Sequence, residues 1–269
     1  MYRGKVIIVT GASSGIGKAI AVEFALRGAS LVMASKNPDN LSQAVNEIKA
    51  IGVPVLGVQT NVSSEAECKA LIQSAVNEFS KIDVLICNAG ISMRALFSDL
   101  KMDVFREVMD VNFYGAVYCT KYALPYLLET KGSVVGMLST AGFRGLPCRS
   151  AYSSAKFALN GFFEVIRTEN MYKGLHVLIA APGFTASNIR KSALNANGEQ
   201  QGESPRSEAK MMTAEYVATR IIGAIHKRKA YLMIPFFEKL VITVNKFFPL
   251  FVDKQVYKYF TWETDSPIN

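Results

Sequence analysis

The chain has 269 residues, half of them apolar, and carries a formal net charge of +8. This length and composition allow one large α/β domain or two small ones and exclude general disorder. Only two histidines and four widely spaced cysteines are present, which argues against a multi-histidine metal site and a serine–histidine hydrolase. We therefore expect no metal, and we expect the cysteines to be reduced thiols of a cytoplasmic protein.

The N-terminal residues run directly into a strand-like segment, so we expect no signal peptide. No uninterrupted apolar run reaches about 18 residues, which argues against a membrane-spanning helix. The positive charge favours acidic partners, such as phosphates, anionic lipid surfaces or an acidic carrier protein. We expect no nucleic-acid partner, because the only basic, aromatic cluster lies in the C-terminal segment.

Strand-like and helical segments alternate along the chain. Apolar runs predict strands over residues 5–10, 30–35, 53–60, 82–88, 132–140 and 175–183. Amphipathic patterns predict helices over about 15–27, 41–52, 65–79 and 99–128, and one that carries residues 152–172. Strict alternation with nearly all-apolar strands predicts a single α/β domain, a doubly wound parallel sheet covered by helices on both faces in three α/β/α layers.

A glycine-rich turn joins the first strand to the first helix. Its sequence is TGASSGIG, and we predict that it binds a pyrophosphate through Thr10, Gly11, Ser13, Ser14, Gly15, Ile16 and Gly17. The glycines permit a tight turn and a close backbone approach, and the N–H groups that open the helix supply donors and a positive dipole end. The flanking strand and helix are the context that such a turn requires.

Tyr152 and Lys156 stand four residues apart in the segment AYSSAKFAL. On a helix these positions share one face, so the phenol and the ammonium can point into one pocket. A nearby ammonium favours the phenolate and lowers the pKa of the tyrosine from about 10. The pair alone is also typical of an ordinary solvated helix face, so the chemistry depends on the other motifs.

From about Lys5 to Ile234 the chain closely resembles the classical short-chain dehydrogenase/reductase family, including its lipid-ketone and hydroxysteroid reductases. The resemblance rests on the T-G-x-x-x-G-x-G turn and on motifs that follow in order: Asn88-Ala89-Gly90, Asn112, Ser139, Tyr152 with Lys156, and Pro182-Gly183. It implies a Rossmann-type fold, a nicotinamide cofactor and oxidoreductase activity on CH–OH groups.

The resemblance also implies a role for each catalytic residue. Ser139 would hold the substrate oxygen, and Tyr152 would exchange its proton as general acid or base. Lys156 would lower the tyrosine pKa and bind the nicotinamide ribose, and Asn112 would hold a proton-relay water. Asn88, Ala89, Gly90, Pro182 and Gly183 would support the cofactor.

The end of the second strand favours NADPH over NADH. Ser35 and Lys36 offer a hydroxyl and a cation to a 2′-phosphate, and no acidic residue follows until Asp39. Asn61-Val62 replaces the family's aspartate-valine beside the adenine, and an asparagine can still accept and donate there. Ser187 keeps a hydroxyl where the family often has threonine. We expect these residues to contact the cofactor.

Two segments depart from the alternation. Residues 184–212 are polar and aperiodic, and they are interpreted either as a substrate lid or as a plain surface insertion. We assign residues 1–234 to the cofactor-binding and catalytic domain and residues 235–269 to an amphipathic, aromatic-rich extension. Its helical stripe continues through Phe251 and consists of Phe237, Leu240, Val241, Val244, Phe247, Phe248 and Phe251.

The extension has two interpretations. An aromatic, basic amphipathic segment can lie in a membrane interface, or the stripe can pack against its own or a second subunit. By analogy we expect reduction of a lipophilic carbonyl compound, either a 3-ketosphinganine-like keto-lipid or a ketosteroid. The alternatives are a 3-oxoacyl-[acyl carrier protein] reductase and a non-catalytic NADPH-binding sensor or scaffold. The family resemblance also implies a homo-dimer or homo-tetramer.

Overall fold

A seven-stranded parallel sheet forms the centre of the computed structural model, which describes residues 2–207 and 211–268. The strand order is β3-β2-β1-β4-β5-β6-β7. The strands are β1 (Val6–Thr10), β2 (Ser30–Ser35), β3 (Val55–Gln59), β4 (Val84–Cys87), β5 (Ser133–Met137), β6 (His176–Pro182) and β7 (Tyr231–Ile234). The order reverses between β1 and β4, and ligands bind at such a switch point, beyond the carboxyl ends of the strands.

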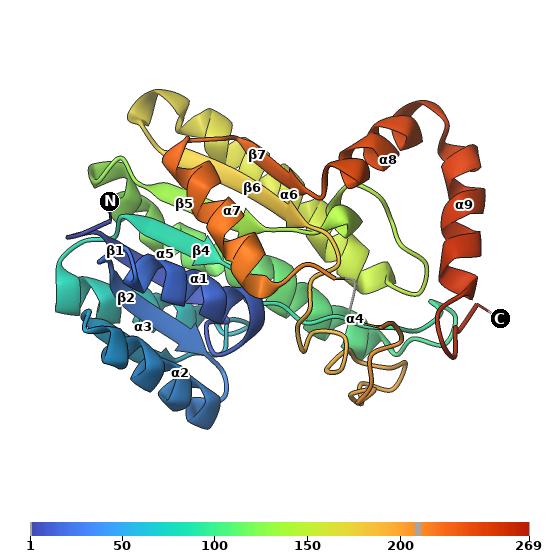
Figure 1. Ribbon diagram of the computed structural model, residues 1–269, viewed down its shortest axis with the longest axis horizontal. Coiled ribbons are helices and arrows are strands. Elements are labelled where there is room, and N and C mark those ends of the chain that lie inside the picture. Colours follow the sequence, from blue (N-terminus) through green and yellow to red (C-terminus); the bar gives the residue numbers. More distant parts are fainter. Residues whose placement is uncertain (1, 208–210, 269) are drawn as a thin grey trace.

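Helices cover both faces of the sheet, as Figure 1 shows. One layer holds α1 (Gly15–Ala25), α2 (Pro38–Ile51) and α7 (Ala214–His226), and the other holds α3 (Glu65–Phe79), α5 (Gly115–Glu129) and α6 (Ser150–Glu169). A shorter helix, α4 (Met102–Met109), precedes α5. The prediction of a single three-layer Rossmann-type domain is confirmed.

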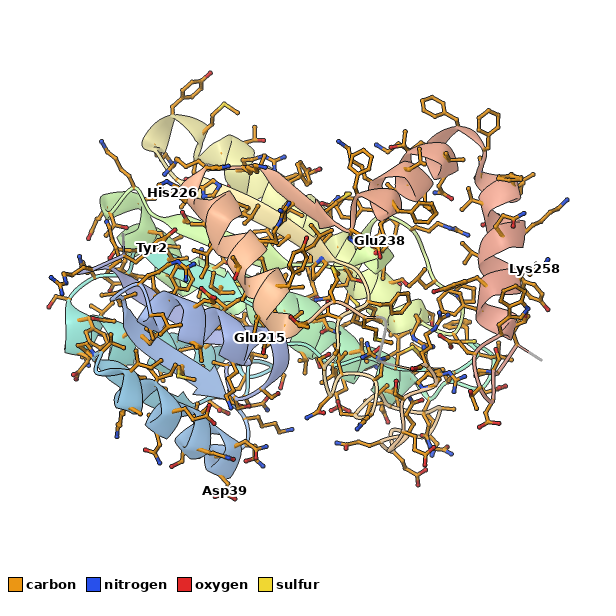
Figure 2. All side chains as sticks on the ribbon, viewed as in Figure 1. Tyr2, Asp39, Glu215, His226, Glu238 and Lys258 are labelled. Atoms are coloured by element: carbon orange, nitrogen blue, oxygen red, sulfur yellow. The ribbon has the colours of Figure 1, made fainter. Side chains whose placement is uncertain are left out.

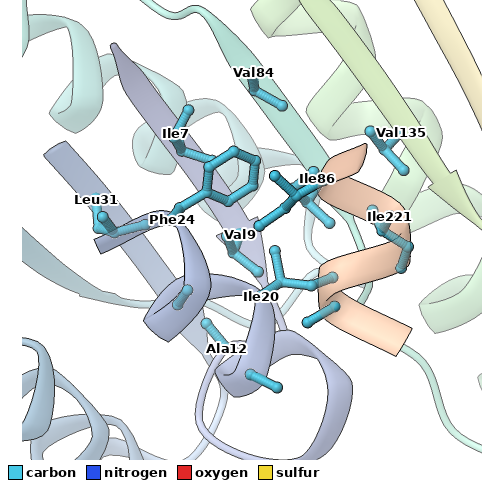
Figure 3. Close-up of a cluster of buried hydrophobic side chains, with 14 of the residues drawn as sticks. Ile7, Val9, Ala12, Ile20, Phe24, Leu31, Val84, Ile86, Val135 and Ile221 are labelled. Carbon is cyan, nitrogen blue, oxygen red and sulfur yellow. The ribbon is translucent and has the colours of Figure 1, made fainter. Parts of the chain in front are cut away.

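Alternate residues of the strands enter two separate cores. Ile7 and Val9 of β1 pack with Phe24 of α1 and Ile221 of α7, and each of these side chains is completely buried (Figure 3). Ile8, between the two β1 residues, packs into the opposite core below α3 and α5. A strand buried on both faces needs apolar residues at every position, which explains the uninterrupted apolar runs.

The long helix predicted over residues 99–128 is interrupted. A π-helical turn, Asp110–Tyr114, separates α4 from α5. Asn112 lies in this turn, and its side chain bonds both backbone groups of Ile91. π-helical turns inside helices are frequent at functional sites, and this one brings Asn112 to the loop that follows β4.

Residues 184–212, where they are described, contain no helix and only isolated bridges. One bridge joins Thr185 to Met212, and another joins Leu194 to Met93. Leu194 is buried in a third, small apolar cluster with Met93, Val104 and Ala151. Part of this polar segment is therefore packed against the loop after β4 and against α4 and α6.

The extension forms two helices, α8 (Phe236–Phe247) and α9 (Pro249–Thr261), which we call, with residues 262–268, the C-terminal arm. The expectation of one stripe continuing through Phe251 was wrong, because the helix stops at Phe248 (φ −131°, ψ 59°). Pro249 lacks an N–H and disfavours a helical residue before it. The arm extends from the sheet beyond β7 (Figure 1). Among the described residues, no helix is long and apolar enough to cross a bilayer.

Candidate active site

A cavity of about 840 Å³ lies between the sheet and the arm. Ser139, Tyr152 and Lys156 line it together with Gly183 of the turn after β6. Most of the opposite wall belongs to the arm and consists of Phe237, Glu238, Leu240, Val241, Val244, Phe251, Val252, Gln255, Val256, Lys258, Tyr259, Phe260, Trp262 and Glu263. The cavity thus has a polar end near the sheet and a largely apolar wall made by the arm.

The serine, tyrosine and lysine converge from two elements. Ser139 follows β5, and Tyr152 and Lys156 lie one turn apart on α6, which begins at Ser150. The Tyr152 phenol lies near the Ser139 side chain. The Lys156 Nζ donates to the carbonyl oxygen of Met137 at 2.7 Å and lies 5.6 Å from the centre of the Tyr152 ring. The three side chains therefore line the same end of one cavity.

Burial dominates the ionisation of this site. Desolvation lowers the pKa of Lys156 to about 8. It also raises the pKa of Tyr152, although the Ser139 side chain and the charge of Arg149 act in the opposite direction. The expected net lowering of the tyrosine pKa by Lys156 is therefore not found. The ammonium is bonded to a backbone carbonyl, and burial of the phenol outweighs the nearby cations.

Asn112 lies behind the cavity rather than in its wall. It is 1% exposed, its Oδ1 accepts from the Ile91 N–H at 2.9 Å, and its Nδ2 donates to the Ile91 carbonyl at 2.8 Å. A Cβ added to Gly90 would lie 3.8 Å from the Lys156 Nζ and would overlap the Asn112 amide. Gly90 is thus the point where Asn112 and Lys156 come together.

The glycine-rich turn is closely packed against the loop after β4. Asn88 Nδ2 donates to the carbonyl oxygens of Thr10 and Gly11 at 2.9 and 3.1 Å. The Thr10 hydroxyl accepts from the backbone N–H groups of Asn88 and Ala89. Gly11 has φ +63°, and a Cβ on Gly17 would overlap the Gly11 carbonyl. This backbone fits the predicted phosphate-binding turn, because side chains would obstruct the close approach.

The residues expected at the adenosine end lie at the carboxyl edge of β2 and β3. The Ser13 and Ser35 hydroxyls are 2.8 Å apart, and Lys36 is exposed. The Asn61 Oδ1 accepts from the Ser63 hydroxyl at 2.9 Å. The Asn61 carboxamide oxygen therefore already has a partner, and Val62 is buried.

The turn after β6 connects the cofactor region to the arm. A Cβ on Gly15 would lie 3.4 Å from the Ser187 Cβ, so this turn lies against the glycine-rich turn. Among the predicted residues, those that line the cavity are Ile16, Asn88, Gly90, Ser139, Tyr152, Lys156, Pro182, Gly183 and Ser187. The remaining predicted cofactor residues lie outside this cavity, along the edge that begins at Thr10.

Sequence reasoning missed the acidic residues of the arm. Glu238 accepts from the Thr140 hydroxyl, next to Ser139. Asp253 pairs with Arg144, whose side chain also lines the cavity. The only signal in the sequence was that Glu238 interrupts an apolar helical pattern, which is equally typical of a solvated position.

Glu263 anchors the end of the arm. Its side chain is 3% exposed. The carboxylate forms ion pairs with Arg206 at 2.7 Å, Arg94 at 3.3 Å and Arg149 at 3.5 Å. These arginines come from three segments, and Arg149 immediately precedes the helix that carries Tyr152. We call this group the Glu263 cluster. Together with the Glu238 and Asp253 contacts, it joins the arm to the segment between Ser139 and Tyr152 at three points.

The chain is similar to known proteins over most of its length. Residues 5–198 match the family model described as short chain dehydrogenase. An 11-beta-hydroxysteroid dehydrogenase A of Sesamum indicum is 35% identical over 73% of this chain, but the match spans only 57% of that protein. An 11-beta-hydroxysteroid dehydrogenase-like 4A of Arabidopsis thaliana is 31% identical over 91% of this chain and 81% of its own. The mouse Dehydrogenase/reductase SDR family member 7B is 34% identical over 84% of this chain and 72% of its own.

Solved structures share the fold at lower identity. A short chain dehydrogenase/reductase from Burkholderia phymatum, in complex with NAD, has a TM-score of 0.84 at 23% identity and covers 93% of this chain and 95% of its own. An alcohol dehydrogenase from Thermococcus sibiricus, complexed with 5-hydroxy-NADP, has a TM-score of 0.76 at 24% identity and covers 86% of this chain and 95% of its own. At these identities the likeness concerns the fold.

Proposed function

Since this chain belongs to the short-chain dehydrogenase/reductase family, we propose that it is an NADPH-dependent oxidoreductase that reduces a lipophilic ketone to a secondary alcohol. One observation carries the proposal: a single cavity has Ser139, Tyr152 and Lys156 at its polar end and the apolar side chains of the arm along its other wall. Such a cavity suits a carbonyl group attached to a large apolar body.

The proton chemistry follows from the contacts of the three polar residues. The Ser139 hydroxyl, which lines the cavity beside the phenol, donates to the carbonyl oxygen and positions it. Tyr152 donates its proton to that oxygen as the alcohol forms, because its raised pKa keeps the phenol protonated at neutral pH. Lys156 stabilises the resulting phenolate, and Asn112 holds the loop that borders the lysine. When bound, NADPH supplies the hydride that reaches the carbonyl carbon.

The residues present fit a nicotinamide dinucleotide. The Gly11–Gly17 backbone would receive the pyrophosphate, because a Cβ at Gly17 would obstruct the turn. Lys156 would hold the nicotinamide ribose, while Ser187 and the Pro182–Gly183 turn would hold the nicotinamide. Ser35 and Lys36 would receive the 2′-phosphate, and the hydroxyl pair that Ser35 forms with Ser13 supports this preference for NADPH.

The substrate class follows from the volume and lining of the cavity. The cavity of about 840 Å³ is lined in part by residues proposed to hold the cofactor, among them Lys156, Gly183 and Ser187, so the nicotinamide and the substrate would share this volume. The remaining space, along the apolar wall of the arm, suits a keto-lipid of the 3-ketosphinganine type or a ketosteroid. The hydroxysteroid dehydrogenase names of the relatives support the same class.

Two other functions compete with this proposal. A 3-oxoacyl-[acyl carrier protein] reductase would use the positive charge of the chain to dock an acidic carrier. The apolar wall of the arm favours a free lipid over a thioester held by a protein. A non-catalytic NADPH sensor would not need Ser139 and Tyr152 in the cavity wall together with the buried Lys156, and this combination favours an enzyme.

We also propose a cytoplasmic protein that associates peripherally with membranes and forms a homo-dimer or homo-tetramer. At the junction of α8 and α9, Phe247, Phe248 and Leu250 are 73%, 65% and 75% exposed. Lys246 and Lys254 flank this apolar tip. Aromatic residues bordered by lysines suit the headgroup region of a bilayer. The alternative is that the same residues pack against another subunit.

An NADPH-oxidation screen tests the proposal. Long-chain 3-ketones, ketosteroids and 3-oxoacyl thioesters are offered as substrates, with NADH in a parallel series as the cofactor control. We expect oxidation of NADPH with the first or second group and a large preference over NADH. Turnover restricted to carrier-bound thioesters would support the carrier-protein alternative. No turnover of any carbonyl, despite tight NADPH binding, would favour the sensor.

A further inference from the structure

Glu238 is a carboxylate that faces the polar end of the cavity. It lies in the first turn of α8, where the chain leaves β7 (Figure 2). The Thr140 hydroxyl donates to one carboxylate oxygen, and a Cβ on Gly183 would overlap the other. The carboxylate is thereby held between the residue that follows Ser139 and the turn proposed to border the nicotinamide.

Glu238 is a partly buried carboxylate without a cationic partner among the described residues. Among residues 2–207 and 211–268, no lysine, arginine or histidine forms an ion pair with it. Desolvation raises its pKa to about 7, and no positive charge acts against this effect. The other acidic side chain of the cavity wall, Glu263, is surrounded by three arginines. Of the two carboxylates in the cavity wall, Glu263 is thus paired with cations and Glu238 is not, within the described part of the chain.

Resting on the proposed ketone reduction, we propose that Glu238 is a substrate-recognition residue that binds a protonated amine close to the carbonyl group. The substrate would then be an amphiphile with an apolar chain, a ketone and an ammonium on a neighbouring carbon. The ketone oxygen pairs with Ser139 and Tyr152 while the ammonium pairs with Glu238. The apolar chain lies along Leu240, Val241 and Val244 of the same helix.

The position of Glu238 supports this assignment over a purely structural role. A hydrogen bond to Thr140 alone needs no charge, since a glutamine or serine would also accept it. A half-buried carboxylate without a cation is costly, and an incoming ammonium removes this cost on binding.

Two ketones that differ only in the amine form the first test. The probes are a long-chain 2-amino-3-ketone and the 3-ketone of the same chain length. We expect kcat/KM of the wild-type protein to favour the amine by about tenfold to a hundredfold, which is typical for a charged hydrogen bond. Glu238→Gln, an isosteric change that keeps an acceptor for the Thr140 hydroxyl, should lower the ratio of kcat/KM for the amine to kcat/KM for the simple ketone to about one. Asp103→Asn, on an exposed α4 side chain, serves as the control for loss of one negative charge.

A binding measurement without turnover forms the second test. A long-chain primary amine and the matching alcohol are titrated calorimetrically between pH 6 and 8, where the amine stays protonated because its pKa resembles the lysine value of about 10.4. As pH rises, Glu238 ionises near its pKa of about 7, so amine affinity should increase. Lys156 loses charge near pH 8 and acts in the same direction. The other charged groups of the cavity are Arg144, Arg149, Arg190, Lys258 and Glu263. Glu238→Gln keeps all of these groups, so the difference between the two curves measures Glu238.

The outcomes separate this inference from the proposed function. Equal turnover of both ketones, or an amine preference that survives Glu238→Gln, would overturn the inference and leave the reductase intact. If neither ketone is reduced, the calorimetric arm still decides. Loss of amine binding in Glu238→Gln supports the amine site, and unchanged binding rejects it.

Discussion

The two walls of the cavity are built on different principles. The wall formed by the sheet and α6 is supported by completely buried strands, and its polar groups have short backbone bonds such as Lys156 to Met137. The wall formed by the arm carries strongly exposed aromatic residues, including Phe237 at 67% and Phe251 at 58%. It is held by side-chain contacts of Glu238, Asp253 and Glu263. We call the wall of the sheet and α6 the rigid wall, and it carries the residues proposed for catalysis. The apolar wall of the arm would contact the substrate and determine which substrates bind.

The largest effect is expected at the rigid wall. Tyr152→Phe should lower kcat about a hundredfold to ten-thousandfold, because the phenyl ring cannot donate a proton. NADPH affinity, measured by fluorescence titration, should stay within about threefold of the wild-type value. Turnover close to the wild-type rate would contradict the assignment of the acid.

Lys156 gives the rigid wall a characteristic pH dependence. The folded protein releases the Lys156 proton near pH 8, whereas the unfolded chain keeps it to about 10.5. The unfolded state therefore binds more protons between these values, and this residue makes the wild type more stable as pH rises through that window. Relative to Lys156→Met, the unfolding free energy should increase by up to about 3 kcal/mol between pH 8 and 10.5. Urea unfolding of both proteins measures it, and a constant difference would refute the shift.

A mutation in the Glu263 cluster tests whether this cluster holds the wall formed by the arm in place. Glu263→Gln leaves three arginines without a counter-ion, so residues 249–268 should lose protection in hydrogen exchange. KM for an apolar ketone should rise about tenfold while the dissociation constant of NADPH remains unchanged. Asp265→Asn, on an exposed neighbour, is the matched control. Equal effects of the two changes would mean that the cluster has no specific role.

The smallest effect concerns the tip of the arm. Phe248→Ser should weaken cosedimentation with anionic liposomes about tenfold, given the free energy of burying one aromatic side chain. Turnover of a water-soluble ketone should not change. If the mutation alters the oligomeric state in light scattering and leaves liposome binding intact, the tip is a subunit contact.

Local patterns were sufficient for the sheet and for placing the predicted catalytic residues Ser139, Tyr152 and Lys156 in the lining of one cavity. Apolar strands alternating with helices predicted the parallel sheet, and the Tyr152–Lys156 spacing placed both side chains on one face of α6. The spacing could not show that burial raises the tyrosine pKa, since burial depends on every element packed around it. It also could not reveal the π-helical turn at Asn112, which depends on bonds to a distant loop.

The arm shows where local patterns fail. The apolar stripe predicts one helix that continues through Phe251, but α8 ends at Phe247 and α9 begins at Pro249. Phe237, Leu240 and Val244 then line the cavity, whereas Phe247 and Phe248 remain at the exposed tip. Residues of one apolar pattern thus lie on two different surfaces, the cavity wall and the exposed tip. The sequence pattern alone does not separate these two groups, because the separation depends on where Pro249 lies relative to the sheet.

By itself, the sequence determined the alternation of apolar strands and helices, the glycine-rich turn and the shared helix face of Tyr152 and Lys156, because each depends on residues within a few positions of one another. Only the tertiary structure decided which groups surround the substrate. Glu238 lies 98 residues from Thr140, and Glu263 lies more than a hundred from Arg149 and Arg94. Contacts between residues so far apart produce no local pattern in the sequence. They could not be predicted, because each partner alone resembles a charged residue on the solvated surface.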